Sequence, residues 1–167
     1  NPGKNRVRMA LVAPLAECIE AKGRFLDPIA NGVWVICEES SWVVPAHIGM
    51  QKAGTGLPDT GEPIVDLFAA ETGALLAWTE YLVGPQLETI SPLLRPRLRR
   101  EVYARIITPC RTRDDFWWMG FKSKHVNNWN PWVNSNWLTC ELLLEAEPKA
   151  RAEGVAKVMR SLDNFVT

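Results

Sequence analysis

The sequence has few of the side chains on which common classes of enzyme depend. Its 167 residues include two histidines and two tyrosines, and its four cysteines show no C-x-x-C spacing. Zinc sites built from cysteine pairs and thiol redox motifs are therefore not indicated. The sequence also has no glycine-rich phosphate loop, no Ser-His-Asp spacing and no cluster of metal ligands. We expect neither a cofactor nor a bound metal.

Net charge and long apolar runs are absent as well. The 19 basic residues balance the 19 acidic residues, so no overall field attracts nucleic acid or an anionic membrane. No apolar run approaches the ~18 residues of a membrane span, and no signal peptide stands at the first residue. The one local concentration of charge, at Arg95, Arg97, Arg99 and Arg100, is predicted to be a solvated helix face.

The pattern that remains is helical. Hydrophobic residues make up 47% of the chain, enough for one core, and no period-2 run of β-branched residues indicates a sheet. A proline after a capping residue, as at Asp27-Pro28 and Asn130-Pro131, is typical of the first turn of a helix. Residues 45–62, rich in Gly, Pro, Asp and Thr, predict a long loop. The predicted helices span residues 6–22, 29–44, 64–83, 93–111, 132–145 and 149–165.

These predicted helices alternate between largely apolar and amphipathic. Such alternation is typical of antiparallel hairpins stacked side by side, with one helix of each pair inside. We therefore predict an all-α chain in which residues 1–167 form a single domain of three stacked hairpins. Three hairpins make only part of an α/α toroid, so more of it is expected after Thr167. The cysteines are predicted to be small buried residues, with a disulfide left open.

The most informative segment is residues 127–137, which contain five asparagines and three tryptophans. Buried amides without partners cost roughly 1–3 kcal/mol each, so a cluster of them beside indole rings requires polar partners. A sugar supplies both hydroxyl or carboxylate partners and C–H faces for the rings. Alternatively, the asparagines satisfy local backbone groups at a helix start, which is the simpler interpretation of Asn130 taken alone.

Two adjacent carboxylates and two histidines could add chemistry. Glu38 and Glu39 fall inside the predicted helix 29–44, where one could be salt-bridged while the other supports a substrate site. His47 and His125 lie in loops next to buried helices, near the helix ends that carry the asparagines. Histidine is well suited to proton transfer near neutral pH, so both are candidates to line a site.

Several stretches together resemble heparinase II/III-like proteins over nearly the whole chain. They are Glu38-Glu39-Ser40-Ser41-Trp42 followed by Ala46-His47, then Leu57-Pro58-Asp59, Asp66-Leu67-Phe68-Ala69-Ala70-Glu71-Thr72, and Asn127-Asn128-Trp129-Asn130-Pro131-Trp132. The resemblance implies an α/α toroid followed by a β-sandwich region and an exported protein, periplasmic or extracellular. It also implies a polysaccharide lyase that cleaves uronic-acid-containing glycans by β-elimination, with acidic polysaccharide as its partner.

By this resemblance Asn128 neutralises the uronate carboxylate, with Asn127 next and Trp129 or Trp132 as sugar platforms. The lyases use a tyrosine as acid and base, but Tyr81 and Tyr103 lie in helix patterns and are predicted to be packing residues. The catalytic tyrosine is then expected after Thr167, and this chain alone is expected to be inactive. The candidate site contains Asn128, Asn127, His47 and Glu39 as catalytic residues and Trp129, Trp132, Asn130, His125 and Glu38 as substrate-binding residues.

Two alternatives stay open at this stage. A glycoside hydrolase on a similar toroid needs two carboxylates about 5–10 Å apart, for which Glu38, Glu39, Asp59 and Asp66 are available. A helical module that binds glycan or protein without chemistry would use the tryptophan-rich surface equally well.

Overall fold

In the described part of the chain, all regular secondary structure is helical, as predicted. The structure is a computed structural model that describes residues 12–122 and 125–166, and this part contains seven α-helices and no β-strand. They are α2 (Ala13–Glu20), α3 (Leu26–Glu38), α4 (Leu67–Ile90), α5 (Leu94–Val102), α6 (Thr108–Thr112), α7 (Trp129–Leu144) and α8 (Pro148–Val166). None of these helices is long and apolar enough to cross a membrane.

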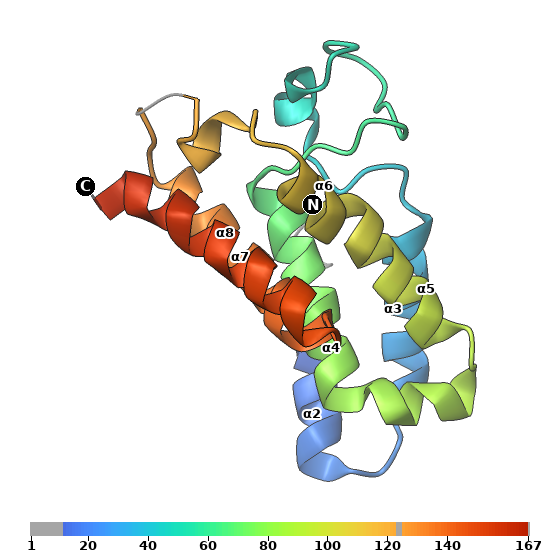
Figure 1. Ribbon diagram of the computed structural model, residues 1–167. Helices are drawn as coiled ribbons and strands as arrows, with labels where there is room; N and C mark the ends of the chain where they lie inside the picture. The colour runs from blue at the N-terminus through green and yellow to red at the C-terminus, as the bar shows by residue number, and fades with distance from the viewer. Residues whose placement is uncertain (1–11, 123–124, 167) are drawn as a thin grey trace.

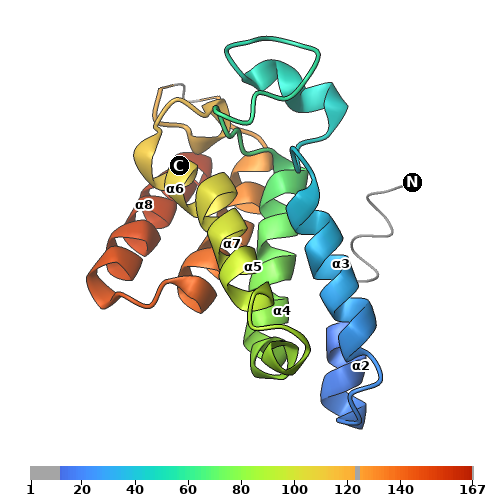
Figure 2. The same ribbon diagram turned by 90° about the vertical axis from the view of Figure 1, so that its right-hand side faces the viewer.

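Successive long helices run in opposite directions, so their connections gather at two ends of the molecule (Figures 1 and 2). Helix α4 lies centrally and packs against α2, α3, α5 and α7, while α8 packs against α7. The connections α2–α3, α4–α5 and α7–α8 lie at one end. The segments 39–66 and 113–122 lie at the other end, beside the first turns of α4 and α7 (Figure 1). We call this second end the loop end.

Helices at the start of the chain are shorter than their sequence patterns. The first predicted helix, residues 6–22, contains α2. Its first residues, 6–11, lie outside the described residues. Helix α3 ends at Glu38 rather than at residue 44, because Glu39 is extended (φ −64°, ψ 137°). The indole N–H of Trp42 then donates to the carbonyl of Ile36 (2.9 Å), which satisfies an acceptor in the last turn. The prediction that Glu39 lies inside a helix is therefore wrong.

Helices in the middle of the chain run further than predicted. Helix α4 continues through Gly84 and Pro85 to Ile90. Gly84 is needed because a Cβ there would collide with the carboxylate of Glu80.

The predicted helix 93–111 is continuous, but it widens into a π-helical segment, Tyr103–Ile107. Pro109 explains the widening, since it has no N–H to donate and its ring clashes with the preceding turn.

Three of the eight tryptophans are structural. The rings of Trp42, Trp118 and Trp137 are at most 2% exposed. Each buried indole N–H has an acceptor, which is the usual condition for burying tryptophan. Trp118 donates to the carbonyl of Val65 and Trp137 donates to Glu141, at 2.9 and 2.8 Å. The other five tryptophans are at least partly exposed.

The arginine run on α5 is not simply a solvated face, so that prediction is wrong. The carboxylate of Glu80 is almost fully buried, and both Arg95 (3.0 Å) and Arg99 (2.7 Å) donate to it. Arg97 pairs with Glu38 and Glu101, both at 3.0 Å. Of the four arginines only Arg100 is well exposed, with 65% of its side chain accessible. The run thus neutralises acids of α3, α4 and its own helix.

A second buried ion pair joins α6, α7 and α8. Glu141 on α7 is fully buried and accepts from the Arg111 guanidinium, with Nε and Oε1 2.9 Å apart. Helix α8 passes directly over this pair at Gly154, where any Cβ would overlap the Glu141 carboxylate. A buried charge is tolerated only when it is paired and hydrogen-bonded. This position therefore fixes how α7 and α8 pack.

The prediction of buried cysteines is confirmed for three of the four. Cys37, Cys110 and Cys140 are buried, Cys18 is exposed, and all four are free thiols. Burial raises the pKa of the Cys37 thiol to about 11 and raises those of Cys110 and Cys140 well above their usual value.

Because the thiolate is the reactive form, an aromatic disulfide reagent should label one thiol per native chain quickly and the others only after unfolding.

The matched control for this labelling experiment is Cys18→Ser. It should remove the fast native phase and leave unchanged the slow phase of the three buried thiols, which react only after unfolding. Fast labelling of two or more thiols in the native chain would contradict the packing described for α3, α6 and α7.

Candidate functional site

Residues from three distant parts of the chain meet at the loop end. His47 lies in a 3-10 turn, Pro45–Met50, and its ring packs edge-on against Trp129 at the start of α7, with ring centroids 4.6 Å apart. Phe68, in the first turn of α4, lies 6.2 Å from the same imidazole, and Trp117 lies 5.0 Å from Trp129. We call these residues together with Asp66 the His47 cluster. The expectation that His47 falls near the asparagine-rich helix start is confirmed.

Asp66 holds His47 in place from the buried side of the His47 cluster. It is fully buried and is the N-cap of α4, where Oδ1 accepts from the backbone N–H of Ala69 at 2.7 Å. Its other oxygen, Oδ2, lies 2.7 Å from Nδ1 of His47 and 3.3 Å from the backbone nitrogen of Val44. One carboxylate thus starts a helix, holds the preceding loop and orients the imidazole.

Asn127 and Asn128 lie exposed immediately before α7. The Oδ1 atom of Asn127 accepts from the backbone N–H of Trp129 at 2.9 Å, which is a local turn of the kind asparagine commonly makes. This contact engages the oxygen of Asn127 and not its amino group. The side chain of Asn128 caps no backbone group in the described part of the helix. The two residues therefore present amide donors at the loop end.

The remaining asparagines near the helix start behave differently. Asn130 is fully buried, and its Nδ2 donates to the carbonyls of Trp118 (2.8 Å) and Ser161 (2.9 Å). Asn134, also buried, donates to the hydroxyl of Ser161 at 2.9 Å. These amides join α7 to α8 and to the 3-10 turn Trp117–Met119. Asn130 is thus placed in the core, not on a surface that a substrate could contact, and we remove it from the candidate site.

Trp132 and His125 flank this start of α7. Trp132 is 46% exposed and can offer a ring face. His125 is exposed in the segment before α7. Of the predicted substrate-binding residues, the structure therefore brings Trp129 and Trp132 to the same helix end as Asn127 and Asn128.

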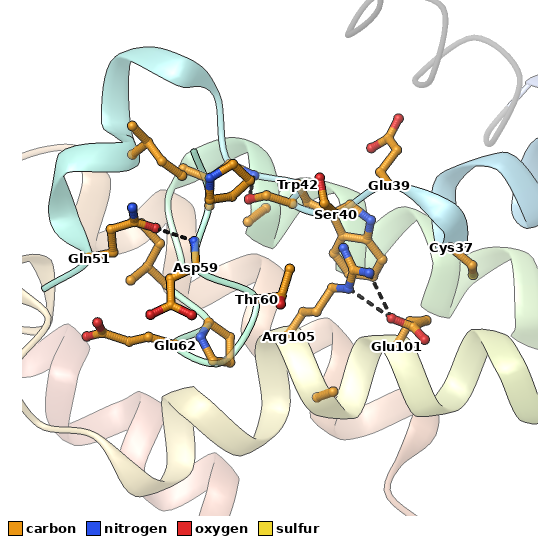
Figure 3. A pocket seen from close by; sticks show the side chains of 18 of the residues that line it. Cys37, Glu39, Ser40, Trp42, Gln51, Asp59, Thr60, Glu62, Glu101 and Arg105 are labelled. Carbon is orange, nitrogen blue, oxygen red and sulfur yellow. Dashed lines mark hydrogen bonds and ion pairs between the residues drawn. The ribbon is translucent and has the colours of Figure 1, made fainter. Parts of the chain in front are cut away.

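Glu38 and Glu39 belong to a separate pocket, which encloses about 350 Å³ (Figure 3). Trp42 and Arg105 lie at its centre, with the guanidinium carbon 4.8 Å from the ring centroid of the tryptophan. Glu101 holds Arg105 through Nε at 2.9 Å. Glu38 forms an ion pair with Arg97. The sequence analysis had allowed one of the two glutamates to be salt-bridged, and that glutamate is Glu38. Two arginines, Arg97 and Arg105, line the pocket together with five carboxylates, Glu38, Glu39, Asp59, Glu62 and Glu101.

The loop that covers this pocket is organised by one buried glutamine. Gln51 donates through Nε2 to the carbonyls of Gly54 (2.8 Å) and Leu57 (2.9 Å), and its Oε1 accepts from the backbone of Asp59 (2.8 Å). The predicted long loop is therefore folded onto a polar side chain. Val43 and Ile48 line the pocket, whereas His47 lies in the His47 cluster and contacts Trp129. The segment from Val43 to Ile48 therefore links the pocket to the His47 cluster.

Sequence reasoning missed the partners of His47. Asp66 was counted only as an available acid, although an aspartate just before a helical run is a typical N-cap signal. Phe68 and Trp117 carried no signal of their own, because nothing in their spacing relates them to residue 47. No group of three or more His, Cys, Asp or Glu residues within residues 12–122 and 125–166 is placed to hold a metal ion.

No protein-family model matches the sequence, and no curated protein matches it either. The structure itself defines an all-helical chain in which histidine, tryptophan and asparagine residues come together at the loop end.

Proposed function

We propose that this chain supplies the acidic-sugar site of a polysaccharide lyase that cleaves uronic-acid-containing glycans by β-elimination. The observation that carries the proposal is the contact of His47 with Trp129, directly beside the exposed Asn127 and Asn128. It places a group able to carry a proton, a flat ring and two amides at one helix end. These are the elements that such a reaction requires.

The exposed amides suit a carboxylate ligand. Asn127 has its oxygen engaged by the backbone of Trp129, so its amino group, which can only donate, is the part left for a ligand. The positive end of the α7 dipole lies at the same place and favours negative charge. The rings of Trp129 and Trp132 can pack against the C–H face of a sugar. Together these groups favour an anionic sugar over a neutral one.

In β-elimination the proton next to the uronate carboxyl is removed, and negative charge then spreads onto that carboxyl group. Donors aimed at the developing charge stabilise the transition state by about 3–4 kcal/mol each. We assign this task to Asn128 first, because its side chain makes no cap, and to Asn127 second. The glycan lies along the loop end in this proposal.

The proposal extends to the fold and to the location of the protein. The helix pairs α2–α3, α4–α5/α6 and α7–α8 would be three hairpins in an arc of an α/α toroid. Contacts of α4 with both α2 and α7, and of α3 with α5, support such stacking. A protein that degrades polysaccharide would act outside the cytoplasm, in the periplasm or the extracellular space.

The carboxylate-lined pocket favours a glycoside hydrolase as the second candidate. Glu39 and Asp59 both line it and come from different segments, and a hydrolase would use two such carboxyl groups about 5–10 Å apart. The products distinguish the candidates. A lyase creates an unsaturated uronate that absorbs in the near ultraviolet, whereas a hydrolase creates reducing ends without that absorbance.

Binding can be tested on this chain alone. We expect uronate-containing oligosaccharides to change the tryptophan fluorescence, and we expect neutral oligosaccharides of the same length to change it much less. Trp132→Ala should weaken binding, while Trp34→Ala, which removes an equally exposed indole on α3 (41%), should leave it unchanged. Equal responses to neutral and acidic sugars would refute the proposed preference.

A further inference from the structure

The hydrogen bonds around Asp66 determine which nitrogen of His47 carries hydrogen. Backbone N–H groups can only donate, and one of them lies on each carboxylate oxygen: Ala69 on Oδ1 at 2.7 Å and Val44 on Oδ2 at 3.3 Å. Asp66 therefore acts as an acceptor at both oxygens. An ionised carboxylate can only accept, so with Asp66 ionised the short contact between its Oδ2 and Nδ1 of His47, 2.7 Å, has the hydrogen on Nδ1.

We propose that Asp66 is a positioning residue that holds neutral His47 with its hydrogen on Nδ1, and that His47 Nε2 is the proton-transfer atom of the loop-end site. The catalytic half rests on the proposed function, whereas the state of the imidazole does not. In a neutral ring with hydrogen on Nδ1, Nε2 carries the lone pair. A nearby carboxylate also stabilises the imidazolium that forms when Nε2 takes up a proton.

The surroundings hold the ring in one orientation. Trp129 packs against it at 4.6 Å and Phe68 lies at 6.2 Å, while Asp66 fixes the Nδ1 edge from the buried side. The His47 side chain keeps 25% exposure. Because the Nδ1 edge faces a fully buried carboxylate, this remaining exposure belongs to the rest of the ring. A base held in one rotamer by packing is better placed for proton transfer than one on a mobile loop.

The tyrosines of the chain do not reach this end. Tyr103 donates its hydroxyl to the carbonyl of Leu144 at 3.3 Å, and Leu144 is the last residue of α7, whereas Trp129 is the first. A helix of this length separates the two points by roughly 20 Å. Tyr81 lies on the middle of α4 and is 64% exposed. Among the described residues, His47 rather than a tyrosine is therefore a proton-carrying side chain that contacts Trp129, next to the exposed amides.

In the proposed step, His47 moves one proton from carbon to the glycosidic oxygen, and one carbon–oxygen bond breaks. The lone pair of Nε2 takes the proton next to the uronate carboxyl, and the C–H electron pair becomes the new C=C bond. The bond from carbon to the glycosidic oxygen breaks, and that oxygen keeps its electron pair. It then receives a proton from Nε2–H, which regenerates neutral His47. No oxidant, reductant or additional reactant is consumed.

The test uses Asp66→Asn, which replaces one oxygen by an amino group of the same shape. Asparagine caps helices as well as aspartate, so its oxygen can still accept from Ala69. Its amino group would then face His47 and donate to Nδ1, which forces the hydrogen onto Nε2. Nitrogen NMR of histidine-labelled protein reports the two states directly. His125→Gln assigns the signals, because the chain has two histidines.

The expected result is hydrogen on Nδ1 of His47 in the wild-type chain near pH 8 and on Nε2 in Asp66→Asn. Hydrogen on Nε2 in the wild type would overturn the positioning role, even if the variant folds poorly. In an active lyase, Asp66→Asn should lower kcat about 10²–10⁴-fold with little change in KM, the usual range for acid–base catalysis. An unchanged kcat together with a switched imidazole would overturn the catalytic role. Absence of any binding of uronate-containing oligosaccharides to the wild-type chain would refute the proposed function but leave the NMR result decisive for Asp66.

Discussion

In an active lyase that contains this chain, Asn128→Ala is expected to lower uronate cleavage about 10²–10³-fold, the usual cost of losing one donor to a developing negative charge. The effect should fall on kcat, because the charge on the uronate carboxyl group increases in the transition state. Stability should hardly change, since Asn128 is exposed and its side chain does not cap α7. The measurement is the near-ultraviolet absorbance of the unsaturated product, together with the melting temperature of each variant.

Asn130→Ala is the matched control, because it removes the same side chain two residues further along the same helix. Its amide joins α7 to Trp118 and Ser161 in the core, so its loss should cost roughly 1–3 kcal/mol of unfolding free energy. If Asn128→Ala instead lowered the melting temperature as much as Asn130→Ala, the exposed amide would be structural. Unchanged cleavage by Asn128→Ala would equally refute its role.

Glu141→Ala is expected to produce the largest loss of stability in the chain. Glu141 is fully buried, accepts from Arg111, and also accepts from the indole N–H of Trp137 at 2.8 Å. Removing one partner of a buried pair costs about 3–5 kcal/mol, because the remaining charge loses its compensation. For a chain of this size that corresponds to a fall in melting temperature of roughly 6–20 °C. Thermal and urea unfolding measure the change.

Two controls separate the loss of charge pairing from simple truncation. Glu88→Ala removes a carboxylate that pairs with Arg95 at the surface, where the Glu88 side chain is 52% exposed, and should cost less than about 1 kcal/mol. The double variant Arg111→Met with Glu141→Leu removes both charges and should recover part of the stability. Equal losses from Glu88→Ala and Glu141→Ala would show that the buried pair contributes nothing special.

Several structural features followed from local sequence signals. The all-helical class was predictable because the apolar residues repeat with a helical period and prolines stand in first turns, as Pro148 does in α8. Helix ends were less predictable. Helix α3 stops at Glu38 because Trp42 folds back onto Ile36, and α4 passes Gly84 because Glu80 needs the space. Both outcomes depend on contacts that spacing alone does not reveal.

The sequence also predicted part of the candidate site. It identified the segment of amides and indoles and selected His47, and the structure places His47 against Trp129. It still counted Asn130 among the substrate-binding residues, although Asn130 is fully buried. Neighbouring positions on a helix point about 100° apart, so the side on which α8 packs decides which amide is buried. The sequence of α7 does not state where α8 lies.

By itself, the sequence determined that this chain forms helices, where most of them begin, and which short segment concentrates polar and aromatic groups. Local chemistry is sufficient for these features, because capping, proline geometry and apolar periodicity act within a few residues. Only the tertiary structure decided that Asp66 meets His47, that Asn130 is buried, and that α5 arginines neutralise Glu80. Those pairings join residues far apart in the chain, and they arise from how whole helices pack.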